Sequence, residues 1–193
     1  HMSWLAFFVC FFAWFACAPL MPVIAGQFHL TKDQIANINI SNNTLLVQLS
    51  CSHNLLSNID VSNNPNLEVF YCDFNQLSNL NITNNNLLEF FNCSDNMLSS
   101  INVSNNTALY MFYCSYNQIN GYLDLSNHTA LGILNCSGNQ LIGLNIQNGN
   151  NMFLSFFDAT QNPGLTCVQV DSVQLMNTNW SSAIDANASY SLL

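Results

Sequence analysis

The feature that most constrains this chain is a cysteine that recurs at nearly constant spacing. Successive cysteines are separated by 21, 21, 21 and 22 residues, and an asparagine follows each of them three positions later. The cysteines are Cys51, Cys72, Cys93, Cys114 and Cys136, and the asparagines are Asn54, Asn75, Asn96, Asn117 and Asn139. A strict period of this length indicates a solenoid, in which each repeat forms one coil and stacked coils share a core.

Apolar residues keep fixed offsets from the cysteine. In the coil of Cys72 they are Leu67, Phe70 and Leu77, which lie five before, two before and five after it. The resulting string Leu67-x-x-Phe70-x-Cys72-x-x-Asn75-x-Leu77 resembles the leucine-rich repeat pattern L-x-x-L-x-L-x-x-N-x-L, with cysteine in place of the third leucine. This resemblance implies a β-rich solenoid of about seven right-handed coils, with a parallel inner sheet and little helix.

A second apolar pair lies eight and ten residues after most of the cysteines, as at Ile59 and Val61. Alternation of this kind predicts a short extended segment with one buried face, and therefore a second, shorter ladder opposite the first. One residue is inserted near Gly121 and Tyr122, where a bulge is expected. The nested period looks like the 21-residue (IRREKO) class, and the stretch 135–141 is similar to secreted repeat proteins of Bacteroidetes-type bacteria.

The organisation along the chain follows from where the period holds. Residues 1–25 are an uncharged, apolar segment that resembles a signal peptide cleaved after Ala25, with an uncleaved anchor or an apolar lid as alternatives. Residues 26–45 read as a degenerate first repeat and 46–166 as the regular repeats. Residues 167–193 lose the period and are similar to a C-terminal cap. A cap is expected because an open sheet edge is a template for unwanted pairing.

Composition narrows the choice of partner. The chain carries ten acidic residues against a single basic one, Lys32, for a net charge of −9. It offers almost nothing to neutralise phosphates, which argues against nucleic acid and anionic membrane surfaces as partners. The repeated cysteines are interpreted as small buried hydrophobes, because adjacent side chains of a parallel ladder run side by side and no pair shows zinc-ligand spacing. No cofactor and no metal ion are predicted.

The 33 asparagines of the chain have a predicted structural role. An asparagine at a corner tolerates left-handed backbone angles, and its amide can bond backbone groups that no strand partner reaches. The asparagine three residues after each cysteine is therefore expected to form a ladder of side-chain amides inside the coils.

Strand alternation predicts which side chains are exposed on the inner, concave face, where they could contact a partner. These candidate binding residues are Tyr71, Phe74, Phe90, Met111, Tyr113, Tyr116 and Ile133. Exposed aromatic and aliphatic patches mark partner sites, although like residues on neighbouring strands can also simply stabilise a sheet. The favoured function is a secreted or cell-surface module, bacterial by the resemblance, that binds an unidentified protein or glycan through this face. The alternative is a structural spacer or a unit of a larger adhesin.

No catalytic residues are predicted, and the chain is not expected to be an enzyme. Asp73 and Asp95 are expected on adjacent coils, and His53 lies near them in the sequence. A hydrolase would require these groups to line a deep pocket. A calcium site at the two aspartates is only weakly indicated, since the chain has no D-x-D-x-D-G loop.

Overall fold

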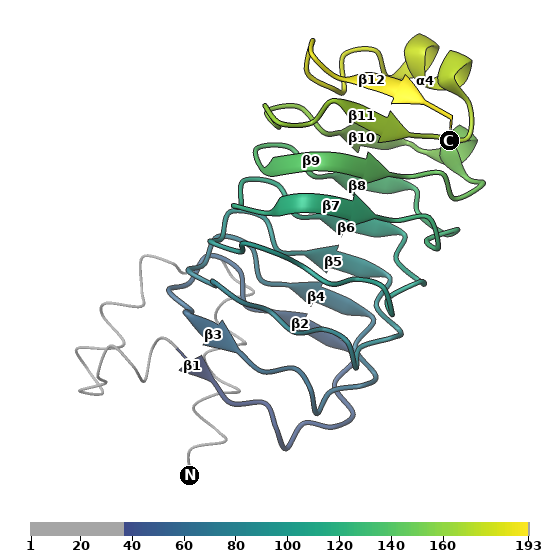
Figure 1. The fold of residues 1–193 in the computed structure, drawn as a ribbon. Helices are drawn as coiled ribbons and strands as arrows, with labels where there is room; N and C mark the ends of the chain where they lie inside the picture. Colours follow the sequence, from purple (N-terminus) through teal and green to yellow (C-terminus); the bar gives the residue numbers. More distant parts are fainter. Residues whose placement is uncertain (1–36, 193) are drawn as a thin grey trace.

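The computed structural model describes residues 37–192, which form a parallel β-solenoid of about seven turns with little helix. Figure 1 shows the coils stacked along one axis, with β1 (Asn37–Ile38) near one end and the C-terminal segment at the other. The predicted fold class is confirmed. The segment 1–25, its proposed cleavage after Ala25 and most of the degenerate first repeat lie outside the described residues.

The main layer is a six-stranded parallel sheet in the order β10-β8-β6-β5-β4-β2. Its strands are β2 (Gln48–Ser50), β4 (Val69–Tyr71), β5 (Phe90–Asn92), β6 (Met111–Tyr113), β8 (Ile133–Asn135) and β10 (Phe156–Asp158). Each residue pairs with its counterpart one period along the chain, so that Phe70 lies beside Phe91 and Phe91 beside Phe112. This register follows from the period, because it buries every apolar centre of a strand on the same side.

The opposite layer is less regular than predicted. It consists of a two-stranded sheet of β1 and β3 (Asn58–Ile59) and a four-stranded sheet in the order β12-β11-β9-β7. The coils between them bury Leu80, Ile82 and Val103 but form no strands there, so the expected second ladder is interrupted. In β7 (Asn120–Asp124) and β9 (Gln140–Asn145) the register shifts between Gly121 and Tyr122, where the extra residue was expected.

Aromatic and aliphatic side chains fill the space between the layers. The rings of Phe70, Phe91 and Phe112 are fully buried and stack with centroids 5.7 and 5.6 Å apart. The five repeated cysteines are also fully buried. Burial raises the pKa of the thiols of Cys72 and Cys114 well above the ordinary value, so these side chains are neutral at physiological pH.

The C-terminal end closes the stack with different elements. A short 3₁₀ helix, η2 (Asn151–Phe153), precedes β10, and β11 (Cys167–Gln169) and β12 (Ser189–Ser191) flank the helix α4 (Val173–Asn179). The Ser172 hydroxyl accepts a hydrogen bond from the Leu175 N–H and caps α4, a helix the sequence did not predict. Within residues 37–192, no helix has both the length and the apolar character needed to cross a membrane.

Candidate functional site

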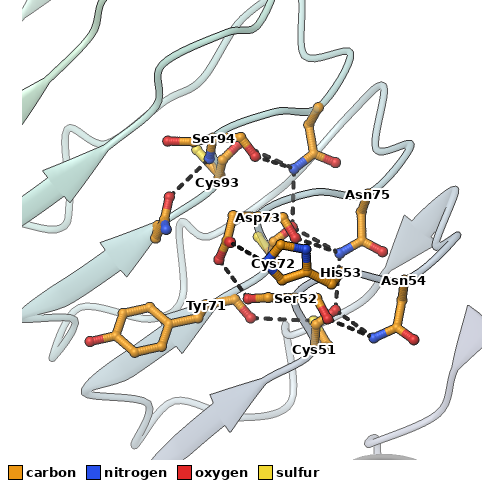
Figure 2. A network of polar contacts seen from close by, with 12 residues as sticks. Cys51, Ser52, His53, Asn54, Tyr71, Cys72, Asp73, Asn75, Cys93 and Ser94 are labelled. Carbon is orange, nitrogen blue, oxygen red and sulfur yellow. Dashed lines mark hydrogen bonds and ion pairs between the residues drawn. The ribbon is translucent and has the colours of Figure 1, made fainter. Parts of the chain in front are cut away.

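The asparagine after each cysteine joins successive coils through hydrogen bonds. Asn96 donates from Nδ2 to the Cys72 carbonyl of the preceding coil at 3.0 Å and to the Cys93 carbonyl of its own coil at 3.2 Å. Its Oδ1 accepts from the Leu77 N–H of the preceding coil at 2.9 Å. Figure 2 shows this arrangement at Asn75, on the side of the coils away from the Tyr71 ring, together with Asn54, which donates to the Cys51 carbonyl of its own coil. The same bonds are made by Asn117, Asn139 and Asn162.

The left-handed backbone at this corner does not fall on the asparagine. The expectation that the asparagines adopt left-handed angles is wrong, because the positive φ angles belong to the residue immediately before each of them. These residues are His53, Phe74, Asp95, Tyr116, Gly138 and Gln161, with φ angles between 51° and 66°. The asparagine needs an ordinary conformation to aim its amide into the coil, so its neighbour makes the turn. For residues with a side chain this costs roughly 1–2 kcal/mol each.

Three columns of side chains run along the outer surface of the six-stranded sheet, and together we call them the sheet surface. The strand-start column is Val69, Phe90, Met111 and Ile133, the strand-end column is Tyr71, Asn92, Tyr113 and Asn135, and the corner column is the left-handed series from His53 to Gln161. Residues of the first two columns are half-buried, whereas Phe74 and Tyr116 of the third are 47% and 51% exposed. All seven candidate binding residues therefore lie on one surface.

The tyrosine and phenylalanine residues of the last two columns occur in alternate coils. The ladder pairs Tyr71 with Asn92 and Asn92 with Tyr113, so the two tyrosines are not strand neighbours. In the corner column Asp95 separates Phe74 from Tyr116 in the same way. The coils of Cys72 and Cys114 thus present an aromatic pair each, and the coil of Cys93 between them presents polar side chains.

A fourth column, of small polar side chains, was not identified from the sequence. It consists of the residue after each cysteine: Ser52, Asp73, Ser94, Ser115 and Ser137. The Ser52 hydroxyl donates to Asp73 Oδ1 at 2.5 Å, and the Ser115 hydroxyl lies 3.0 Å from that of Ser94. Ser94 and Ser115 are more than 90% buried. Strand alternation places this hydroxyl column between the strand-end and corner columns, and the same alternation would have revealed it in the sequence.

Several titratable side chains lie around Asp73. His53 Nε2 lies 3.9 Å from Asp73 Oδ2, and the His53 ring stacks on Phe74 with a centroid distance of 4.4 Å. Burial and the neighbouring Asp73 raise the pKa of Asp95, while His53 lowers it. Burial, then Asp73 and Tyr113, raise the pKa of Tyr71. The sheet surface is therefore acidic, and within residues 37–192 it has no lysine or arginine to balance these carboxylates.

The serine nearest to His53 and Asp73 is bonded to the carboxylate and not to the imidazole. Ser52 donates to Asp73, and among the described residues no hydrogen bond joins His53 to a serine. A histidine that acts as the base for a serine comes within hydrogen-bond reach of it during the reaction. The His53 side chain is 60% exposed and is held by ring stacking, whereas a catalytic base is held in a pocket. The cluster is better suited to attracting a positive charge.

A second buried amide column lies at the opposite corner and was also missed. Asn106 donates to the carbonyls of Ile82 and Asn85 at 3.1 and 2.8 Å, and Asn85 repeats the pattern one coil earlier. His128 occupies this position in the next coil, with Nε2 3.1 Å from the Val103 carbonyl. Asn64, Asn85 and Asn106 recur at steps of 21 residues, which was the available signal.

Comparison with known proteins gives partial similarities. No protein-family model matches the chain. The high affinity nitrate transporter 2.5 of Arabidopsis thaliana is 45% identical over 42 residues, which are 22% of this chain and 8% of the transporter. A solved structure of the functional domain of InlJ from Listeria monocytogenes, described as including a cysteine ladder, is 26% identical. The match covers 72% of this chain and 42% of the InlJ chain, with a TM-score of 0.45. The chain thus spans less than half of either protein.

Proposed function

We propose that this chain is a binding module that recognises a partner through the sheet surface. The observation that carries the proposal is that aromatic residues occupy positions where the local backbone favours a small polar residue such as asparagine. Asn92 and Asn135 accept hydrogen bonds from the N–H groups of Ser94 and Ser137, closing the turn after the strand. Tyr71 and Tyr113 occupy the same position and cannot make this bond.

The corner column supports the same conclusion. Phe74 and Tyr116 have φ angles of 52° and 51°, where aspartate, asparagine or glycine would be less strained. Both rings are nevertheless about half exposed, so the strain does not serve to fill the core. Aromatic residues that are exposed at a conformational cost are typical of binding surfaces.

The strand-start column has a simpler explanation. Phe90, Met111 and Ile133 are consecutive strand neighbours, and such apolar cross-strand pairs stabilise a sheet without any ligand. These three residues fit the alternative proposal, in which the solenoid is a structural spacer or a unit of a larger adhesin. Tyr71 and Tyr113, and likewise Phe74 and Tyr116, are separated by a polar coil and do not form such cross-strand pairs with one another, although Phe74 stacks on His53 and Tyr113 contacts Phe156.

The setting we propose is outside the cell. A secreted or surface-displayed protein of the 21-residue repeat class is supported by the repeat wording of residues 135–141 and by the apolar segment at residues 1–25. The domain limits proposed from the sequence follow the same resemblance, with regular repeats over 46–166 and a cap from 167.

A selection experiment tests the function. A phage library of random twelve-residue peptides is selected on the protein, and the recovered clones are compared on two variants. The first is Tyr71→Asn with Tyr113→Asn, which copies the residue found at Asn92. The second is Tyr122→Asn, which removes a 54% exposed ring from β7 in the opposite layer.

We expect clones to bind the wild type and the Tyr122→Asn variant but to lose about ten-fold or more in affinity for the double variant. Circular dichroism of all three proteins verifies that they are folded. Clones that bind the double variant as well as the wild type would place binding elsewhere and contradict the proposal.

A further inference from the structure

The spacing of the aromatic pairs indicates the conformation of what they bind. The two pairs, Tyr71 with Phe74 and Tyr113 with Tyr116, belong to coils that are two strands apart in the sheet. Neighbouring strands are about 4.8 Å apart, which places the attachment points of the two pairs about 9.6 Å apart along the solenoid axis. A ligand that contacts both pairs in the same way repeats over about this length.

Regular peptide conformations differ clearly in this repeat. A β-strand repeats its side-chain direction every two residues, or about 6.7 Å, and an α-helix completes a turn in about 5.4 Å. A polyproline II helix has three residues per turn and rises 3.1 Å per residue, so its repeat is about 9.3 Å. Only the last of these matches the separation of the two aromatic pairs.

The chemistry of the surface fits the same ligand. Proline-rich segments bind where aromatic side chains form ridges, because their preformed conformation loses little entropy and their rings pack on flat apolar faces. The hydroxyl column, with the buried Ser94 and Ser115, follows the strand-end column and precedes the corner column in each coil, so small side chains separate the two aromatic columns. Between the two aromatic pairs the surface presents Asp95, and Asp73 lies beside it.

The charge determines the residue expected between the prolines. Nine of the ten acidic residues of the chain, and none of its lysines or arginines, are within residues 37–192. An arginine of the ligand would face Asp73 and Asp95 and at the same time lie against the rings of Tyr71 and Tyr113, which attract cations.

We infer that the sheet surface binds a proline-rich, arginine-containing segment of a partner protein in the polyproline II conformation, running along the solenoid axis. Successive turns of the ligand pack on the aromatic pairs of the Cys72 and Cys114 coils. An arginine between them pairs with the partly exposed Asp95, and the buried Asp73 adds negative charge beside it. The inference rests on the proposed function and specifies the partner of the same surface.

Fluorescence anisotropy with labelled twelve-residue peptides tests this assignment. The probe consists of four Pro-Pro-Arg triplets. A Gly-Ser-Arg peptide of the same charge lacks the preformed helix, and a Pro-Pro-Glu peptide keeps the helix but reverses the charge. A neutral glucose hexasaccharide, measured by calorimetry, represents the glycan alternative.

Two pairs of variants separate a local contact from the overall negative charge. Asp73→Asn with Asp95→Asn removes two charges from the sheet surface, and asparagine still accepts the Ser52 hydrogen bond and tolerates the left-handed φ at position 95. Asp60→Asn with Asp124→Asn removes two charges from the opposite corner. There Asp60 and Asp124 each accept from a serine N–H, as Asn102 does in its own coil, so the turns are preserved.

We expect the Pro-Pro-Arg peptide to bind at least ten-fold more tightly than either control peptide, and the Asp73/Asp95 pair of substitutions to weaken it about five-fold at low salt. The Asp60/Asp124 pair should change its affinity less than two-fold. Phe74→Asn with Tyr116→Asn should weaken binding about ten-fold, because it removes one ring from each aromatic pair while relieving strain.

Four results would overturn the inference. Equal binding of the Gly-Ser-Arg peptide, or equal losses in both aspartate pairs, would mean that only net charge is recognised. Binding of the hexasaccharide without binding of the Pro-Pro-Arg peptide would identify a glycan ligand. In that last case, or if library clones without proline-rich sequence depend on Tyr71 and Tyr113, the proposed function stands and only the ligand assignment fails.

Discussion

Removal of one amide from the column beside the cysteines is the sharpest test of how the coils are held together. In Asn96→Ala the Cys72 carbonyl loses one of its two amide donors, at 3.0 Å, and keeps the one from Asn75, while the Leu77 N–H loses its acceptor at 2.9 Å. The bonds to the carbonyls of its own coil, at Cys93 and Ser94, are lost as well. Asn96 is more than 90% buried, so water cannot easily replace these partners.

The expected cost follows from counting the bonds the side chain can make at once. Two N–H hydrogens and one carbonyl oxygen support three bonds, each worth about 1 kcal/mol net, so Asn96→Ala should lower the free energy of unfolding by about 3 kcal/mol. Asn106 lies in the opposite column and donates two hydrogen bonds, while its Oδ1 has no partner among the described residues. Asn106→Ala should therefore cost about 2 kcal/mol. Asn105→Ala removes one exposed bond and should cost about 0.5 kcal/mol or less.

Urea unfolding followed by circular dichroism measures all three variants against the wild type at one protein concentration and pH. A fall of 3 kcal/mol corresponds to a shift of about 6–12 °C in melting temperature for a chain of this size. The slope of the transition must also be compared, because a repeat protein can lose cooperativity when one interface between coils is weakened. If Asn96→Ala and Asn105→Ala are equally stable, the amides do not hold the coils together and the argument fails.

Three further predictions concern particular positions. Burial lowers the pKa of His128 below 6.5, so near that pH the unfolded chain binds a proton that the folded chain does not. The free energy of unfolding should therefore fall as the pH drops below 6.5, by at most about 1.4 kcal/mol per pH unit from this group. Unfolding curves of His128→Asn should show a smaller fall. Iodoacetamide at pH 8 should label the half-buried Cys167 before the fully buried Cys93, as peptide mapping would show, and equal rates would contradict the observed burial. Gly132→Ala would place a methyl group 2.4 Å from the Tyr110 ring, which must move; we expect about 1 kcal/mol lower stability in urea unfolding, and Tyr110→Ala should remove the penalty.

Most of the fold was predictable because every coil of a solenoid repeats the same backbone path and the same buried positions. The spacing of the cysteines fixed the register of the six-stranded sheet, and the apolar offsets identified side chains such as Phe91 that are fully buried. The extra residue near Gly121 was located from the break in the period alone. Periodicity carries this information because inward-facing positions must be apolar in every coil.

The details that were missed depend on backbone geometry that periodicity does not record. Asn75 and Phe74 are adjacent at the same corner, and sequence preference assigns the left-handed angle to the asparagine. The structure assigns it to the phenylalanine, because the asparagine amide must reach the carbonyl of Cys51 in the preceding coil. The opposite amide column was hidden for another reason: His128 replaces asparagine in one coil, and exposed asparagines such as Asn105 surround the buried ones.

The same comparison bears on function, because stability and the sheet surface favour different residues. Two aromatic residues in left-handed conformation cost roughly 1–2 kcal/mol each, and two missing turn hydrogen bonds cost about 1 kcal/mol each, which is about 4–6 kcal/mol for Tyr71, Phe74, Tyr113 and Tyr116 together. That is comparable with the whole stability of many domains, about 5–15 kcal/mol. Ring contacts such as that of Phe74 with His53 recover only part of it, about 0.5–1.5 kcal/mol per pair. Packing therefore does not explain why these coils differ from the coil between them, and this difference is what the proposed recognition of a partner accounts for.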